Sequence, residues 1–265
     1  MLRDRLIMGE IFESNIIDKK KIISEIKGTK HEKTLISTGS KNFNKAIGGG
    51  FFSGNVYVVF GANKTGKTQI CHQLSVEAFE KSFQVVYLDT ENTFRPERVL
   101  ELAESNKYNS EKTLKNIYVS KIMSNNALLL KLNELDSIIK TNNVKLLIID
   151  SINNFFRIER SDTQISFLKA KSTYVKILEK INKLTQRFEL VTILTTQVAP
   201  NFVEEAVVKE FPVGIQYLNH FFSEVLYLNH KEKDMIYIHL VNSLFLPEKK
   251  VTYSITKRGI EDYKM

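Results

Sequence analysis

The residues best suited to chemistry are two glycines, a lysine and a threonine at the spacing G-x-x-x-x-G-K-T. Glycines let the backbone bend so that successive N–H groups point into one concavity, which suits phosphate oxygens. The lysine would place a positive charge on the β- and γ-phosphates, and the threonine hydroxyl would bind Mg²⁺. The candidate nucleotide-binding residues of this stretch are Gly61, Ala62, Asn63, Lys64, Thr65, Gly66, Lys67 and Thr68. The stretch therefore predicts a site for ATP and Mg²⁺, with Lys67 also catalytic.

A second metal ligand is expected at the end of another buried strand. Asp150 follows residues 146–149, a continuous apolar run typical of a strand covered on both faces. Ligands of open α/β sheets bind at the carboxyl ends of parallel strands. We therefore predict that Asp150 shares the metal with Thr68, directly or through water. The alternative is an aspartate that caps the following turn.

Hydrolysis of ATP also needs a group that orients and deprotonates a water molecule. Asp89 and Glu91 both follow the strand-like residues 84–88. Either carboxylate would lie in a third carboxyl-end loop of the sheet. Spacing alone leaves both open.

A parallel sheet is the element that would bring these residues together. Strand-like apolar runs alternate along the chain with stretches of helical periodicity, which predicts an α/β fold with helices on both faces of a mostly parallel, twisted sheet. The expected strands are 56–60, 84–88, 146–149 and 190–194, and the expected helices are 97–104, 127–140 and 165–187. Residues 222–257 alternate in short β-like segments, which predicts C-terminal antiparallel hairpins.

Composition sets the class of protein. The 265 residues and 43% apolar content suit one sizeable domain with a small appendage, which we place as a basic arm or short helix at 1–35 before a core at 36–265. A single cysteine, Cys71, excludes a disulfide within the chain and favours a reducing compartment. No apolar run approaches the roughly 18–20 residues of a membrane span. We expect an intracellular, cytoplasmic protein (nuclear if eukaryotic) without a membrane partner.

The net charge of +8 is compatible with binding a polyanion. A generally lysine-rich composition explains the same number equally well. The basic arm, with Lys19 to Lys33 as its basic residues, is one candidate for nucleic-acid contact. Charge alone therefore allows a nucleic-acid partner without requiring one.

Longer stretches of the chain resemble the RecA/RadA-type recombinases, most closely their archaeal and eukaryotic branch. The most specific match is Tyr87-Leu88-Asp89-Thr90-Glu91-Asn92-Thr93-Phe94-Arg95-Pro96-Glu97-Arg98. Further matches are Ile36-Ser37-Thr38-Gly39-Ser40-Lys41, Gly48-Gly49-Gly50, Gln69-Ile70-Cys71-His72, Leu147-Ile148-Ile149-Asp150-Ser151, Phe156-Arg157, Leu194-Thr195-Thr196-Gln197-Val198, Pro212-Val213-Gly214, His220 and Leu246-Pro247-Glu248. The likeness covers about residues 36–262 and implies a RecA-like P-loop NTPase core.

The resemblance also implies roles for single residues. Glu91 matches the catalytic glutamate, which decides against Asp89, and Gln197 matches the glutamine that senses the γ-phosphate and opens the second DNA-binding loop. Arg98 matches the arginine that packs on adenine, and Gln69 continues the nucleotide-binding stretch. Without the resemblance, Arg98 would be a helix-surface charge and Gln197 a polar residue at a strand end.

Three more residues match positions that act across a subunit boundary. The resemblance implies that His220 reads the neighbour's γ-phosphate and that Pro247 caps its nucleotide. Asn242 stands where the family has an aspartate that holds cations near that phosphate, so a charge is lost and we expect slower or differently salt-dependent hydrolysis. From sequence alone, His220 could be a core histidine and Pro247 a turn residue.

The chain also departs from the family where DNA should bind. The second loop, about 198–214, carries three glutamates and one lysine, a charge of −2, although a loop that grips phosphates should be basic. The first loop, about 157–166, offers two arginines, and one phenylalanine of the second loop could stack on bases. The candidate DNA-binding residues are Arg157, Arg160, Phe202 and Lys209.

The family's N-terminal helical DNA-binding domain does not fit into the roughly 35 residues before the core, and the Phe-x-x-Ala hook of its linker has only a weak echo in Phe12-Glu13-Ser14-Asn15. We therefore expect a paralogue, an ATP-dependent DNA-binding protein of homologous recombination and repair. It would bind single-stranded DNA and modulate a full-length recombinase or another paralogue. Two alternatives stay open. One is a genuine strand-exchange recombinase that forms homo-oligomeric filaments, and the other is an ATP-binding regulatory protein without a direct DNA role.

Overall fold

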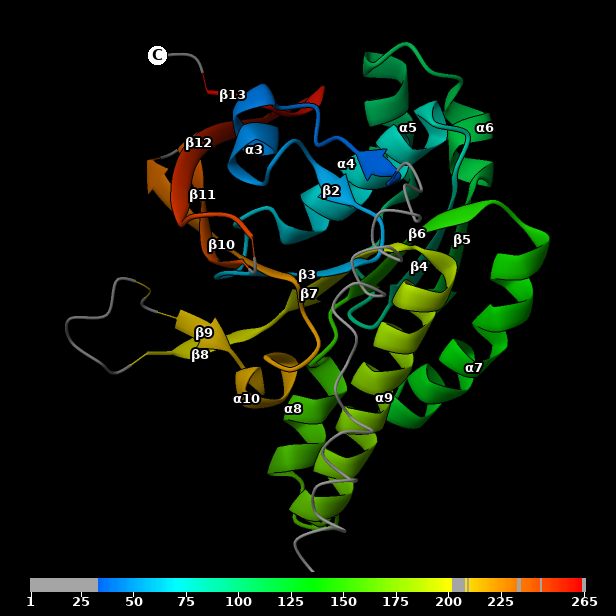
Figure 1. Cartoon of the computed structure of the whole chain (residues 1–265), viewed down its shortest axis with the longest axis vertical. Helices are drawn as coiled ribbons and strands as arrows, with labels where there is room; N and C mark the ends of the chain where they lie inside the picture. The colour runs from blue at the N-terminus through cyan, green and yellow to red at the C-terminus, as the bar shows by residue number, and fades with distance from the viewer. Residues whose placement is uncertain (1–32, 202–207, 209, 233–234, 244, 264–265) are drawn as a thin grey trace, which may run out of the picture. The chain divides into compact units, whose positions relative to one another are not determined.

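A nine-stranded sheet dominates the described part of the chain (Figure 1). The computed structural model describes residues 33–201, 208, 210–232, 235–243 and 245–263. The basic arm up to residue 32, Phe202 and Lys209 therefore lie outside the described residues. The order of the strands is β13-β12-β11-β10-β3-β7-β6-β4-β5.

Six neighbouring strands of this sheet, from β10 to β5, run parallel. Their bounds are β10 Glu224–Glu232, β3 Asn55–Phe60, β7 Val191–Thr196, β6 Val144–Asp150, β4 Gln84–Asp89 and β5 Ile117–Lys121. The other three, β11 Met235–Ser243, β12 Lys249–Thr256 and β13 Gly259–Asp262, continue the sheet in antiparallel fashion. The predicted parallel sheet and C-terminal hairpins are confirmed. The hairpins extend the main sheet, because β10 also pairs parallel with β3.

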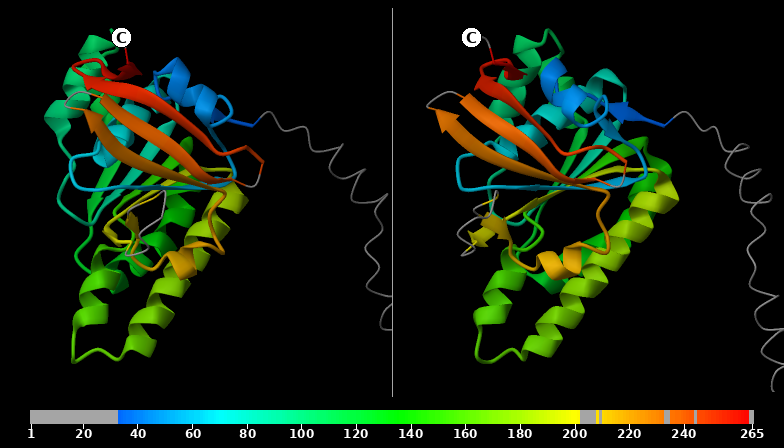
Figure 2. Two further views of the ribbon diagram at one scale, coloured as in Figure 1. Left: turned by 90° about the vertical axis from the view of Figure 1, so that its left-hand side faces the viewer. Right: turned by 60° about the vertical axis from the view of Figure 1, so that its left-hand side comes forward.

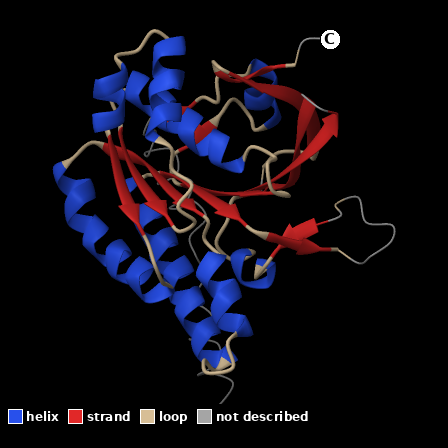
Figure 3. Ribbon diagram, turned by 180° about the vertical axis from the view of Figure 1, so that it is seen from behind, coloured by secondary structure: helices blue, strands red, loops and turns tan. Residues whose placement is uncertain are grey.

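Helices cover both faces, and each face has its own apolar core (Figures 1 and 3). One face carries α3 Lys41–Ala46, α4 Lys67–Glu80, α5 Pro96–Ser105 and α6 Ser110–Lys115. The opposite face carries α7 Asn125–Thr141, α8 Asn154–Ser161, α9 Phe167–Phe188 and the short α10 Ile215–Leu218. Alternate residues of each strand enter opposite cores: Tyr87 packs on the α4 side and Leu88 on the α7 side. Burial on both faces explains why these strands read as unbroken apolar runs.

Local signals set the ends of the main helices. Ser124 and Ser166 accept hydrogen bonds from backbone N–H groups in the first turns of α7 and α9, respectively. Helix α4 is instead preceded by Gly66 at its N-cap position, whose backbone is left-handed (φ 99°) and which offers no side-chain hydrogen bond. The first N–H groups of α4 are thus left without a side-chain acceptor, a condition that suits an anion at this helix start.

The structure differs from the sequence-based expectation in two places near the site. Residues 157–161 belong to α8 and so are helical, where a loop was expected. Strand β5 was not expected, because only its first residue, Ile117, is buried and its pattern lacks a continuous apolar run. Figure 2 shows α8 and the first turns of α9 projecting together beyond the sheet. Two small antiparallel pairs complete the described strands: β1 Leu35–Ile36 with β2 Phe51–Phe52, and β8 Val198–Pro200 with β9 Glu210–Pro212.

No helix among the described residues is long and apolar enough to cross a membrane.

Candidate nucleotide-binding site

The phosphate loop joins β3 to α4, and two of its positions require glycine. A Cβ atom on Gly61 would lie 2.1 Å from the Leu228 carbonyl oxygen of β10, and Gly66 has a φ of 99°, a backbone conformation that other residues rarely adopt. Lys67 Nζ donates hydrogen bonds to two loop carbonyls, Gly61 O at 2.7 Å and Ala62 O at 2.8 Å. The lysine is therefore folded over the concavity of its own loop, where a phosphate group would compete for its ammonium.

Five of the eight predicted loop residues line one cavity of about 280 Å³ together with predicted residues from three strand ends, whereas Gly61, Ala62 and Thr65 are not part of the lining. The lining residues are Asn63, Lys64, Gly66, Lys67, Thr68, Gln69, Glu91, Thr93, Asp150, Gln197 and Ile255. Burial lowers the pKa of Lys67, and the nearby carboxylates of Asp150 and Glu91 oppose that shift. A partly desolvated lysine interacts more strongly with an incoming phosphate than an exposed one would.

Asp150 is the most densely hydrogen-bonded side chain of the cavity. Its Oδ2 accepts from Thr68 Oγ1 at 2.8 Å, from Tyr87 OH at 2.9 Å and from Thr93 Oγ1 at 3.2 Å. Its Oδ1 accepts from Thr195 Oγ1. Sequence reasoning found Asp150 and Thr68 but missed the other three. Their polar side chains at or near strand ends were the available signal.

The pair of Thr68 and Asp150 fits a bound Mg²⁺. The threonine gives its hydroxyl hydrogen to Asp150, which leaves its oxygen lone pairs for a cation. Both are hard oxygen ligands, and Mg²⁺ in nucleotide sites is usually held by one or two such protein groups together with phosphate oxygens and waters. Buried Asp150, only 3% exposed, would keep its orientation when the ion binds.

Asp89 and Glu91 are used differently. Asp89 accepts three backbone N–H bonds, from Glu91 at 3.1 Å, Thr93 at 3.2 Å and Phe94 at 3.0 Å, and so fixes the loop after β4. Glu91 faces the cavity, where its Oε1 accepts from Ser151 Oγ and from Gln197 Nε2, the latter at 2.8 Å. The geometry therefore favours Glu91 over Asp89 as the group that meets a water molecule in the cavity.

Asn153 fixes the backbone around Gln197, and sequence reasoning missed it. Its Oδ1 accepts from Gln197 N at 2.8 Å, and its Nδ2 donates to Gln197 O and Val213 O, both at 2.9 Å. The asparagine side chain is fully buried. It therefore ties together the two ends of the segment 198–212, which begins and ends with the strands β8 and β9.

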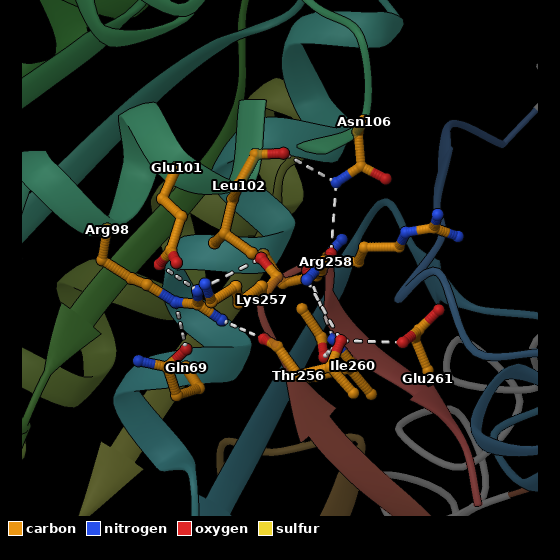
Figure 4. A network of polar contacts seen from close by, with 12 residues as sticks. Gln69, Arg98, Glu101, Leu102, Asn106, Thr256, Lys257, Arg258, Ile260 and Glu261 are labelled. Atoms are coloured by element: carbon orange, nitrogen blue, oxygen red, sulfur yellow. Dashed lines mark hydrogen bonds and ion pairs between the residues drawn. The ribbon is translucent and has the colours of Figure 1, made fainter. Parts of the chain in front are cut away.

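Arg98 of α5 connects the phosphate-loop helix to the turn after β12 (Figure 4). Its Nε donates to Gln69 Oε1 at 2.9 Å, and its Nη2 donates to Thr256 O at 2.6 Å. Nη1 is paired with Glu101 and also donates to Lys257 O at 3.2 Å. Arg98 itself does not line the cavity, but its guanidinium contacts Gln69, which does. Its predicted packing on adenine stays a prediction.

Three of the remaining predicted residues lie outside the cavity lining, whereas Arg157 contacts one of the lining residues. His220, after α10, Asn242, on β11, and Pro247, between β11 and β12, are all exposed and do not line the cavity. A role toward a neighbouring subunit requires such exposure. Their roles across a subunit boundary stay predictions. Arg157 and Arg160 are exposed on α8, and Arg157 Nη1 donates to Gln197 Oε1 at 2.8 Å.

Comparison with known proteins decides the family. The model of the Rad51 family matches residues 29–263, most of the chain. The chain belongs to the Rad51 family. It is 30% identical over 244 residues to the DNA repair and recombination protein RadA of Methanococcus maripaludis, a match that covers 86% of this chain and 76% of that protein. It is 29% identical over 236 residues to the RadA of Aeropyrum pernix, covering 86% and 73%.

Membership of the Rad51 family confirms the predicted resemblance to RecA/RadA-type recombinases and the RecA-like core. Both relatives are named for DNA repair and recombination, so the chain belongs to a family of that role. The phosphate loop, Asp150 and Glu91 all lie inside the matched range.

Proposed function

We propose that the protein is a Mg²⁺-dependent ATPase that binds single-stranded DNA and acts in homologous recombination and repair. In this proposal it is a paralogue that modulates a full-length recombinase. The observation that carries the proposal is the meeting of Lys67, Thr68, Asp150, Glu91 and Gln197 in one cavity at the carboxyl ends of β3, β6, β4 and β7. Family membership supports the same class of activity.

The residues divide the work of hydrolysis. Lys67 and the loop N–H groups neutralise charge on the β- and γ-phosphates. Thr68 and Asp150 hold Mg²⁺, which when bound polarises those phosphates. Glu91 orients the attacking water and accepts its proton, and Gln197 links the state of the nucleotide to the segment that follows it.

DNA contacts are proposed for the exposed arginines of α8. Both Arg157 and Arg160 present positive charge on α8, Arg157 contacts the cavity-lining Gln197, and the net charge of +8 is compatible with a polyanionic partner. Lys209 and Phe202 stay proposals on sequence alone. The charge of −2 in the second loop favours weak DNA binding, which suits a modulator better than an autonomous strand-exchange enzyme.

The protein partners that we propose follow from the family and from the three residues expected to act across a subunit boundary. We propose that the protein meets a full-length recombinase, another paralogue or a second copy of itself, and that His220, Asn242 and Pro247 then act on the neighbour's nucleotide. The compartment that suits this function is intracellular. Gln69 and Arg98 complete the proposed nucleotide-binding set, with Arg98 packing on adenine.

The test is binding of a labelled single-stranded oligonucleotide with and without ATP over a salt series, followed by strand exchange. We expect binding at low salt that weakens steeply as salt rises, because lysine and arginine release counterions from the DNA. No binding at low salt would favour an ATP-dependent regulatory protein instead. Efficient strand exchange by the protein alone would make it a recombinase in its own right.

A further inference from the structure

We infer that Arg157 is a positioning residue that couples a phosphodiester bound at α8 to the hydrolytic glutamate. The inference rests on the ATPase proposed above and deepens it. Its basis is a continuous chain of hydrogen bonds: Arg157 Nη1 donates to Gln197 Oε1 at 2.8 Å, and Gln197 Nε2 donates to Glu91 Oε1 at 2.8 Å. Ser151 Oγ donates to the same glutamate oxygen. We call these four residues the relay.

The chemistry of its two ends fixes the orientation of the middle residue. A guanidinium can only donate hydrogen bonds and an ionised carboxylate can only accept them. The amide of Gln197 must therefore turn its oxygen to Arg157 and its NH₂ group to Glu91. The opposite orientation would place donor against donor at one end and acceptor against acceptor at the other. Arg157 thus determines what Gln197 offers to Glu91.

When Arg157 changes its partner, only the side chain of Gln197 is free to move in response. Its backbone N–H and C=O are both held by buried Asn153, at 2.8 and 2.9 Å. A change at Arg157 therefore acts on the glutamine side chain without first moving β7. This arrangement confines the signal to the short path from α8 to the cavity.

Arg157 is placed to receive the signal. It is exposed on α8, and its contact with Gln197 uses Nη1, one of the three nitrogens of the guanidinium that can donate. Guanidinium groups bind phosphates through two parallel hydrogen bonds, which are stronger than a single bond to a neutral amide oxygen. A DNA phosphodiester therefore competes effectively for Arg157.

Engagement of Arg157 releases the glutamate. Glu91 Oε1 accepts hydrogen bonds from two donors, Ser151 Oγ and Gln197 Nε2, and is poorly available to an attacking water while both bonds persist. When Arg157 turns to a phosphodiester, Gln197 loses its partner and is free to leave Glu91 for the γ-phosphate side of the cavity. Single-stranded DNA accordingly raises kcat for ATP hydrolysis with little change in the affinity for ATP.

The test compares turnover with and without a saturating oligo(dT) for wild type and three variants. Arg157→Ala should raise the DNA-free kcat by about three- to tenfold, as expected for loss of one exposed charge-assisted hydrogen bond, and remove further stimulation by DNA. Arg157→Lys should keep at least part of the stimulation, because an ammonium can still donate to Gln197. Arg160→Ala removes the same charge from the same helix and should weaken DNA binding but keep full stimulation at saturation.

A second readout does not depend on activity. If DNA and Gln197 compete for Arg157, replacing the glutamine by methionine should tighten oligo(dT) binding in wild type and leave it unchanged in Arg157→Ala, because coupling is reciprocal. Equal effects of Gln197→Met in both backgrounds would overturn the inference. The inference would also be overturned if Arg157→Ala kept the wild-type ratio of kcat with DNA to kcat without DNA. A wild type that hydrolyses ATP at the same rate with and without DNA would overturn it as well. The last result would contradict the role of Arg157 but not the proposed ATPase function. If instead no ATP is hydrolysed while Gln197→Met still tightens oligo(dT) binding only when Arg157 is present, the proposed ATPase function is contradicted and the competition for Arg157 is not.

Discussion

Threonine hydroxyls decide much of the geometry around Asp150. The carboxylate accepts from Thr68, Thr93 and Thr195 as well as from Tyr87, and these donors come from α4, from β4 and the loop after it, and from β7. Such a set holds both oxygens of a buried carboxylate in one orientation. The phosphate loop and Asp150 could be predicted from spacing and strand patterning. The hydroxyl donors could not, because their role depends on the register between β4, β6 and β7.

Thr195→Val tests the contribution of one of these donors. The change removes the hydrogen bond to Asp150 Oδ1 with almost no change of shape, so we expect about 1–2 kcal/mol less stability and a higher Mg²⁺ concentration for half-maximal ATP hydrolysis. Thr192→Val is the matched control, since this buried threonine of the same strand pairs with Thr185 instead. It should cost similar stability without changing the Mg²⁺ requirement. Equal Mg²⁺ curves for both variants would contradict the role of Thr195.

Glu224 predicts a pH dependence of stability. Burial raises the pKa of its carboxyl from 4.5 to about 7, and Oε2 finds no hydrogen-bond partner among the residues that the structure describes. The folded protein therefore favours the protonated form, and stability is lost as the pH rises from 4.5 through 7. Glu224→Gln should remove this loss, making the variant about 2–3 kcal/mol more stable than wild type at pH 8 and equal to it near pH 4.5. Urea unfolding at both pH values checks this, and parallel pH profiles of the two proteins would refute it.

Strand ends and the connections between them carry the rest of the site. Strands β4, β6 and β7 were predictable because burial on both faces makes them continuously apolar. Strand β5 and helix α8 were not, since β5 buries one residue and α8 follows a strand end where a DNA-binding loop was expected. The consequence of the helix is specific: it brings Arg157 within hydrogen-bond distance of Gln197.

Asn153→Ala tests how these connections are held together. Without its amide, Gln197 and Val213 lose the side chain that joins both ends of the segment 198–212, so we expect faster hydrogen exchange at residues 197 and 213 and a loss of about 1–3 kcal/mol. Asn154→Ala is the neighbouring control, because that amide donates to Thr90 O at 2.7 Å. It should leave exchange at 197 and 213 unchanged. Equal exchange in both variants would show that β8 and β9 hold the segment without Asn153.

At the scale of the whole molecule, the strand order of the sheet explains how residues far apart in sequence form one site. The order β3-β7-β6-β4 places the ends of four strands side by side, so residues 61–68, 91, 150 and 197 converge although they are far apart in sequence. Family membership, fold and cavity support the hydrolysis of ATP that we propose for this edge. Acidic character in the second loop and the neutral Asn242 are the features that set this chain apart from its recombinase relatives in our proposal.

The most direct test of hydrolysis at this edge is a comparison of Glu91→Gln with wild type. Glutamine keeps the shape of the side chain but cannot accept the proton of the attacking water, so we expect the variant to bind a fluorescent ATP analogue with an affinity within about threefold of wild type while its Mg²⁺-dependent turnover falls by about 10²-fold or more. Asp89→Asn, which should disturb the loop but not the chemistry, serves as the control. Wild-type turnover in Glu91→Gln would contradict the assignment of Glu91 as the general base.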